Sequence, residues 1–159
     1  MAMLDGEIKT LLDNYKLKIT RIKVKPWGFT IGVKPSSVQQ FADTFFPEFH
    51  LSSEFLSSRF ILVNPNSRLS WQKHERRGEL WKIIKGPVGV MVSETDQQPN
   101  KLEIKGTGSL IQVEPSVRHR LVGLKKIAII AETWIHSDKN NPSDADDIVR
   151  LDDDYKRWD

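Results

Sequence analysis

The stretch at residues 64–86, NPNSRLSWQKHERRGELWKIIKG, decides how the rest of the chain is interpreted. Side chains alternate between the two faces of an extended strand. Ser70, Gln72 and His74 therefore share one face, while the residues between them point the other way. This alternation brings an amide and an imidazole to the same side of a predicted strand.

A tight charged turn is expected next, formed by Glu-Arg-Arg-Gly at residues 75–78. Gly78 would adopt an unusual backbone angle there, and Glu79 would re-enter the sheet facing the polar side chains of the first strand. His119 follows another strand and turn, and it adds a fourth candidate ligand. An amide, two imidazoles and a carboxylate together suit a divalent cation.

The composition indicates one soluble globular domain. The chain has 159 residues, of which 38% are hydrophobic and 28% charged, and this length is enough to bury a substantial core. Its longest uncharged apolar run, residues 127–131, is far too short to cross a bilayer. Because there is no cysteine and no secretory signal pattern, we expect a cytoplasmic protein without disulfides that does not act at a membrane.

Charge is distributed unevenly along the chain. Residues 144–159 carry seven Asp against three Lys or Arg, so the net charge of +3 leaves +7 on the preceding residues. The basic residues are scattered among acidic ones, and no motif for binding DNA or RNA is present. We therefore expect no nucleic-acid partner.

Two short helices are expected before the strands. Ile8, Leu11, Leu12 and Tyr15 form one apolar stripe at helical spacing. A second amphipathic helix is expected to begin after Pro35 and to end before Pro47, within a Phe-rich insertion at residues 34–58. The phenylalanines of this insertion are most simply core residues.

Short strands dominate the remainder. Turn signals recur every 8 to 12 residues, which is typical of antiparallel sheets packed as a sandwich or barrel. Two strands are expected before the insertion, at residues 18–25 and 29–33, and the later ones at 60–63, 69–74, 80–85, 88–93, 102–104, 109–113, 119–122 and 127–134. We divide the domain into residues 1–58, a barrel core at 59–136, and an acidic C-terminal segment at 137–159 that packs on the barrel.

Two spacings resemble the motifs of the cupin superfamily. Gln72-x-His74, four residues, Glu79, six residues and Gly86 resembles the first cupin motif with Gln in place of its first His, and residues 108–119 resemble the second. The sequences LSWQKHERRGELW and DDIVRLDDDYKR, and Pro26-Trp27-Gly28, resemble the cupin domain of type II mannose-6-phosphate isomerases. The second motif departs from the family pattern, since Ser116 stands where glycine is usual.

The resemblance implies a fold, a cofactor and a reaction. The fold would be all-β, a cupin jelly-roll barrel of antiparallel strands with a short N-terminal helix and a helical insertion. The cofactor would be a divalent metal, zinc first and manganese, iron or nickel as alternatives. The reaction would convert mannose 6-phosphate to fructose 6-phosphate through an enediolate, whose negative charge a Lewis-acidic metal stabilises. The expected metal ligands are Gln72, His74, Glu79 and His119.

The substrate would be a small sugar phosphate, which needs basic and hydroxyl donors. Ser70, Arg77 and Arg150 are the candidates for binding it, Arg150 on the strength of the C-terminal resemblance. Glu132 is the candidate base, because it is the acidic residue of the last long strand and burial would raise its pKa. Arg120 should instead form a structural salt bridge on the opposite face.

Two other functions remain open, and the oligomeric state is a separate expectation. A non-catalytic cupin that binds a sugar or sugar phosphate would keep the fold without turnover. An iron oxygenase would use two histidines and one carboxylate, although a fourth protein ligand at Gln72 argues against it. We also expect a homodimer, with residues 34–58 covering the site or contacting the second subunit.

Overall fold

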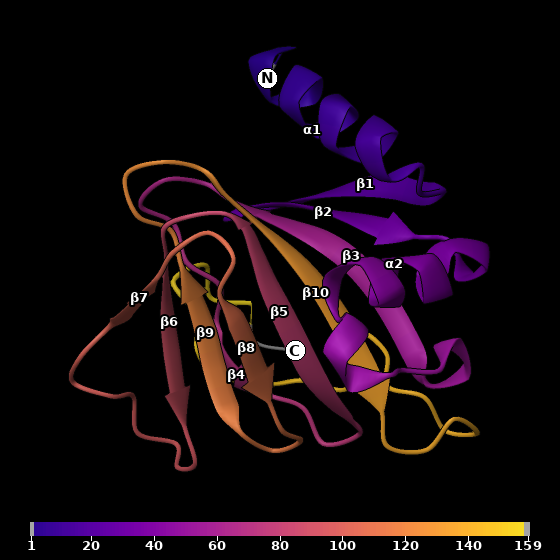
Figure 1. The fold of residues 1–159 in the computed structure, drawn as a ribbon. Coiled ribbons are helices and arrows are strands. Elements are labelled where there is room, and N and C mark those ends of the chain that lie inside the picture. The colour runs from indigo at the N-terminus through magenta and orange to yellow at the C-terminus, as the bar shows by residue number, and fades with distance from the viewer. Residues whose placement is uncertain (1, 158–159) are drawn as a thin grey trace.

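The computed structural model describes residues 2–157, and two antiparallel sheets dominate it (Figure 1). One sheet has the strand order β1-β2-β3-β10-β5-β8, and the other has the order β11-β4-β9-β6-β7. This arrangement confirms the expected jelly-roll barrel. The helices are α1 (Ala2–Tyr15) and α2 (Val38–Phe45), and the 3₁₀ turns are η1 (Pro35–Ser37), η2 (Pro47–Phe49) and η3 (Ser53–Phe55). The strands are β1 (Ile19–Lys25), β2 (Gly28–Val33), β3 (Leu56–Val63), β4 (Trp71–Lys73), β5 (Arg77–Lys85), β6 (Val88–Ser93), β7 (Glu103–Lys105), β8 (Leu110–Val113), β9 (Arg118–Val122), β10 (Ala128–His136) and β11 (Val149–Asp152).

The central strands of the six-stranded sheet, β3, β10 and β5, are largely buried on both faces. Along β3, Phe60 and Leu62 face the helices, whereas Ile61 and Val63 face the barrel interior. Strands covered on both sides have nearly continuous apolar sequences, and Phe-Ile-Leu-Val is such a run. In β5 the same alternation directs Trp81 into the interior cluster, and it therefore turns Glu79 inward as well.

The Phe-rich insertion packs on the outer face of this sheet. Phe41 and Phe45 of α2 contact Phe60 of β3, with ring centroids 5.2 and 5.8 Å apart respectively. Figure 1 shows α2 against β3, and α1 beyond the edge strand β1. These phenylalanines are core residues, as expected. Among the described residues, no helix is long and apolar enough to span a membrane.

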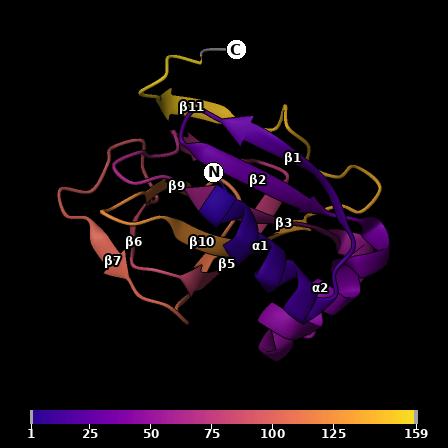
Figure 2. The same ribbon diagram turned by 90° about the horizontal axis from the view of Figure 1, so that it is seen from above.

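The C-terminal segment returns to the barrel and adds a strand to the second sheet. β11 pairs with β4, with Arg150 in register with Gln72. Viewed from above, β11 lies close to β1 and β2 (Figure 2). Asp153 anchors the end of the segment by accepting hydrogen bonds from the side chain and the backbone N–H of Arg157. The segment therefore extends the second sheet at the edge formed by β4.

Asp147 fixes the beginning of the same segment. Its carboxylate accepts hydrogen bonds from the backbone N–H groups of Glu75 and Arg76, and from the Ser143 hydroxyl. Burial alone would raise the pKa of Asp147, but these hydrogen bonds outweigh burial and hold the pKa at about 2. The pKa of Asp153 is likewise about 2, where bonds from Arg157 and Tyr155 outweigh burial.

The lowered pKa values of Asp147 and Asp153 predict that the folded protein loses stability in acid. Both have folded-state pKa values below the unfolded value of 3.8, so their stabilisation is present above about pH 4 and is lost as pH falls toward 2. Each should contribute about 2 kcal/mol. Urea unfolding at several pH values should show a smaller pH dependence for Asp147→Asn than for wild type. The exposed Asp146→Asn serves as the control, and an equal slope in all three proteins would refute the assignment.

Candidate metal centre and adjoining pocket

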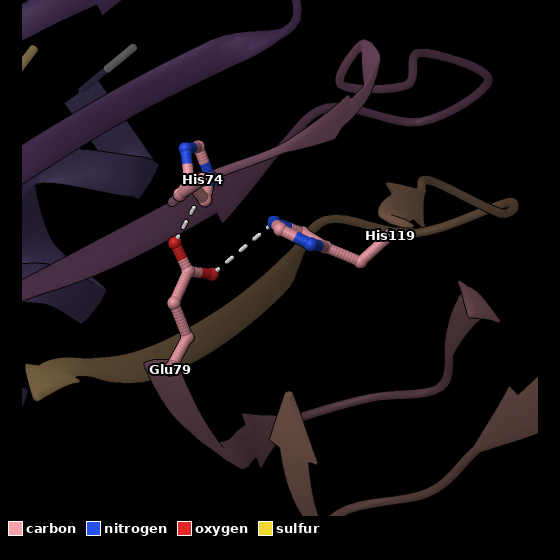
Figure 3. A group of neighbouring side chains, drawn as sticks. All are labelled: His74, Glu79 and His119. Atoms are coloured by element: carbon pink, nitrogen blue, oxygen red, sulfur yellow. Dashed lines mark ion pairs between the residues drawn. The ribbon is translucent and has the colours of Figure 1, made fainter. Parts of the chain in front are cut away.

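Three buried side chains converge inside the barrel (Figure 3). His74 follows β4, Glu79 lies on β5 and His119 lies on β9. Their candidate ligand atoms all lie within 4.8 Å of one another. The Glu79 carboxylate is between the two imidazoles: Oε1 is 3.2 Å from Nε2 of His74, and Oε2 is 3.4 Å from Nε2 of His119. The structure therefore brings together three of the four predicted ligands.

Gln72, the fourth predicted ligand, lies beside this group. It pairs in register with His119 across β4 and β9. Its amide nitrogen donates a hydrogen bond to the Ser70 carbonyl at 3.3 Å. Its ligation stays a prediction.

The turn before Glu79 differs from the expected one. The turn is made by Glu75 and Arg76, whereas Arg77 and Gly78 already belong to β5. Gly78 has no left-handed backbone angle. A Cβ atom there would instead lie 3.1 Å from the carbonyl oxygen of Val113. Glycine is therefore needed because the backbones of β5 and β8 approach closely at this position. The prediction of a four-residue turn ending at Gly78 was wrong.

Hydrogen bonds fix the tautomers of both histidines. Nδ1 of His74 lies 2.7 Å from the carbonyl of Asp147, and Nδ1 of His119 lies 2.9 Å from the carbonyl of Val117. A carbonyl only accepts, so each Nδ1 must carry the proton and donate. In a neutral ring, Nε2 is then left with a lone pair, and both Nε2 atoms face Glu79. Metal-binding histidines are commonly oriented by such a bond from the other ring nitrogen.

At neutral pH the contact between His119 and Glu79 holds no proton. Burial lowers the pKa of His119 to about 4, so its ring is neutral near pH 7. Burial also raises the pKa of Glu79, but the charges of His119, His74 and Arg77 and the hydrogen bond with His74 outweigh it and hold the pKa well below its usual range. An imidazole lone pair thus faces a carboxylate oxygen at 3.4 Å with no proton between them. This arrangement fits a bound cation.

An arginine already contacts part of this group. Arg77 donates from Nε to Glu79 Oε1 at 3.0 Å, and its Nη2 lies 3.1 Å from Nε2 of His74. Nη1 donates to the Ser143 hydroxyl at 2.8 Å, and the guanidinium stacks on the Trp134 ring at 3.5 Å. The side chain is only 5% exposed. A metal that took both ligand atoms would therefore require this guanidinium to move.

A basic pocket adjoins the group on the other side of Arg77. Its volume is about 270 Å³, and Ser70, Arg77 and Arg150, the three predicted substrate residues, all line it. The Ser70 hydroxyl is buried without a hydrogen-bond partner in the described part of the chain. Other hydroxyl groups in the lining come from Thr20, Thr30, Ser57 and Ser58. The chemistry of this lining suits an oxyanion.

Several pocket residues were not predicted. Arg21, Lys23 and Lys25 of β1 and Arg59 of β3 also line the cavity. The signal was present in the sequence, since residues 21, 23 and 25 alternate as expected for one face of a strand. Only the fold reveals that this face is turned toward the C-terminal segment.

Glu132, the predicted base, is not part of the pocket lining. Its buried carboxylate accepts hydrogen bonds from Arg59 at 2.6 Å, Trp81 at 2.9 Å and Trp134 at 2.8 Å. Burial raises its pKa above the ordinary value, although Arg59 opposes this effect. Arg120 has the structural role expected for it, donating to the carbonyl of Leu69 and to Asp152.

Comparison with one solved structure supports the fold. Oxalate decarboxylase from Bacillus subtilis superposes with a TM-score of 0.60 at 17% identity, over 83% of this chain and 30% of that chain. A cupin 2 conserved barrel domain protein from Salinispora arenicola matches with a TM-score of 0.45 at 14% identity, over 52% of this chain and 65% of that one. The chain thus spans less than a third of the decarboxylase.

Sequence comparison identifies the family. No curated protein matches significantly. The family model described as "Mannose-6-phosphate isomerase C-terminal" matches residues 47–153, which is more than half of the chain. This match includes the predicted metal ligands and β11, and it confirms the resemblance noted in the sequence. The chain belongs to the mannose-6-phosphate isomerase C-terminal family of cupin domains.

Proposed function

We propose that this chain is a metal-dependent sugar-phosphate isomerase that interconverts mannose 6-phosphate and fructose 6-phosphate. The carrying observation is that Arg77 contacts His74 and Glu79 and also lines the basic pocket. A cation site and an anion site therefore adjoin at one residue. A sugar phosphate offers both features, since its hydroxyl and carbonyl oxygens suit a metal and its phosphate suits the pocket.

Each part of the site has a separate task. The His74, Glu79 and His119 group would hold the metal, with zinc proposed first, and Gln72 would be the fourth ligand. A metal bound there supplies Lewis acidity for the charge that develops on two adjacent sugar oxygens. Ser70, Arg77 and Arg150 would orient the phosphate. Glu132 stays the proposed base, although its carboxylate bonds to Arg59, Trp81 and Trp134 and does not line the pocket.

A coupled assay tests the proposed reaction. Purified protein should convert mannose 6-phosphate to fructose 6-phosphate, and a chelator should abolish the conversion until a divalent metal is restored. Sugar-phosphate binding without turnover under zinc, manganese, iron or nickel would reject the isomerase proposal. That outcome would favour a non-catalytic binding module, in which Arg77 keeps its contacts with Glu79 and His74.

Metal content is a separate prediction. Wild-type protein should hold about one divalent metal per chain, as expected for a single three- or four-ligand site. His74→Ala and His119→Ala should each lower this content by at least tenfold, measured by elemental analysis after reconstitution. His50→Asn is the matched control, because His50 is exposed and has a left-handed backbone that asparagine tolerates. Equal metal content in all four proteins would contradict the assignment.

Several further expectations are part of the proposal. The homodimer, the cytoplasmic location and the absence of a nucleic-acid partner stay predictions. Size-exclusion chromatography with light scattering tests the first of them directly.

A further inference from the structure

The edge strand β1 carries a row of basic side chains along the pocket. Arg21, Lys23 and Lys25 occupy alternate positions, and all three belong to the lining. Four residues of extended chain span about 13 Å. The row is therefore much longer than one phosphate group. Arg150 and Arg157 of the C-terminal segment line the same cavity, and Figure 2 shows that segment close to β1.

The positive charge of the lining is only partly balanced. Among the side chains that the structure describes, no Asp or Glu lines the pocket. Three lining arginines have carboxylate partners behind the wall: Arg59 with Glu132, Arg77 with Glu79, and Arg157 with Asp153. Among the side chains that the structure describes, no carboxylate forms an ion pair with the cations of β1. Arg21 and Lys23 are exposed to solvent and Lys25 is half-buried, so β1 presents three cations without a described carboxylate partner on one side of the cavity.

The crowding of cations affects the pKa of Lys25. Burial lowers the pKa of Lys25, and Arg59, Lys23, Arg157 and Arg150 lower it further. Like charges gathered in this way destabilise the empty protein, and an anion relieves the repulsion. The Ser70 hydroxyl, directly before β4, is buried without a partner among the described residues and supplies an additional donor in the lining.

We infer that the pocket accommodates a sugar substrate with two anionic groups, either two phosphates or a phosphate and a carboxylate. A single phosphate carries at most two negative charges near neutral pH, which is fewer than the uncompensated cations of β1 alone. One anionic group binds near Ser70 and Arg77, and the second binds along Lys23 and Lys25. This inference goes beyond the proposed function, because mannose 6-phosphate and fructose 6-phosphate each carry only one anionic group.

Calorimetric binding at about 0.15 M salt tests the inference with matched probes. Fructose 1,6-bisphosphate should bind at least tenfold more tightly than fructose 6-phosphate, and pyrophosphate more tightly than inorganic phosphate. The affinity for the bisphosphate should also fall more steeply with added salt. Equal affinities for the singly and doubly phosphorylated sugars would overturn the inference.

A pair of double variants locates the second anion site. Lys23→Gln/Lys25→Gln should remove most of the preference for the bisphosphate while leaving fructose 6-phosphate affinity within about threefold. Lys125→Gln/Lys126→Gln removes the same charge from an exposed loop outside the pocket, and it should retain the preference. If both double variants lose the preference for the bisphosphate equally, the preference depends only on the net charge of the protein, and the inference is overturned. Thermal unfolding verifies that both variants are folded.

The outcomes distinguish this inference from the proposed reaction. Turnover of mannose 6-phosphate without a preference for doubly anionic sugars would reject only the second anion site. A preference located at Lys23 and Lys25 without any isomerase activity would reject only the reaction.

Discussion

Replacing Arg77 with glutamine is expected to raise the affinity of the metal centre for a divalent cation at least tenfold. The guanidinium bonds to Oε1 of Glu79 and contacts Nε2 of His74, so it engages two of the atoms that a metal would need. At an effective dielectric constant of about 20, two unit charges 4 Å apart interact by roughly 4 kcal/mol. A tenfold change in metal affinity corresponds to about 1.4 kcal/mol. Removing about a third of that repulsion would therefore be enough to raise the affinity tenfold.

The same substitution should act in the opposite direction on the anion pocket. Because Arg77 also lines that pocket, Arg77→Gln should weaken sugar-phosphate binding. Metal affinity is measured by competition with a chelating dye, and phosphate affinity by calorimetry. Arg77→Lys retains the charge and should remain near wild type in metal affinity. A glutamine variant that binds metal no better than wild type would show that the guanidinium does not compete with it.

Much of the fold was predictable because its turn signals are local. Gly-Pro before residue 88 and the polar run after residue 93 delimit β6, whose observed bounds match the expected strand. The beginning of β5 was missed by three residues, because Arg76, Arg77 and Gly78 have the composition of a turn. The reason for Gly78 is the nearby backbone of Val113. No pattern within the stretch itself could reveal that contact.

The candidate site was predictable in its residue types but not in its contacts. Motif spacing identified His74, Glu79 and His119, and the structure brings these three together. The sequence assigned Arg77 to substrate alone, whereas its contact with the metal group depends on the inward face of β5. Glu132 was chosen as the acidic residue of a long strand. Its hydrogen-bond partners are Arg59 of β3, Trp81 of β5 and Trp134 of its own strand. Composition does not indicate which side chains of other strands will reach a given carboxylate.

The C-terminal segment illustrates a different limit. Its seven aspartates have the composition of a solvated tail. Asp147 and Asp153 are nevertheless buried and bonded to backbone N–H groups, while Asp144 and Asp146 are exposed. Which carboxylate faces inward depends on where β11 meets β4, and composition does not record that register.

Replacing Glu79 with glutamine should have the largest effect on stability. The substitution leaves the buried Arg77 guanidinium without its carboxylate, and loss of one partner from a buried ion pair typically costs about 3–5 kcal/mol. Urea unfolding of metal-free protein should show a decrease of this size. Glu75→Gln is the matched control, because that exposed carboxylate pairs with Lys73 at the surface and should cost less than about 1 kcal/mol.

The double variant Arg77→Met/Glu79→Gln shows whether the unpaired charge causes the loss. If it does, removing the guanidinium should restore part of the stability, so the double variant should unfold at a higher urea concentration than Glu79→Gln alone. Additive losses from the two substitutions would show that the residues stabilise the barrel independently. In that case the carboxylate would be held mainly by the two histidines, and Arg77 would be attached to the site through Ser143 and Trp134 instead.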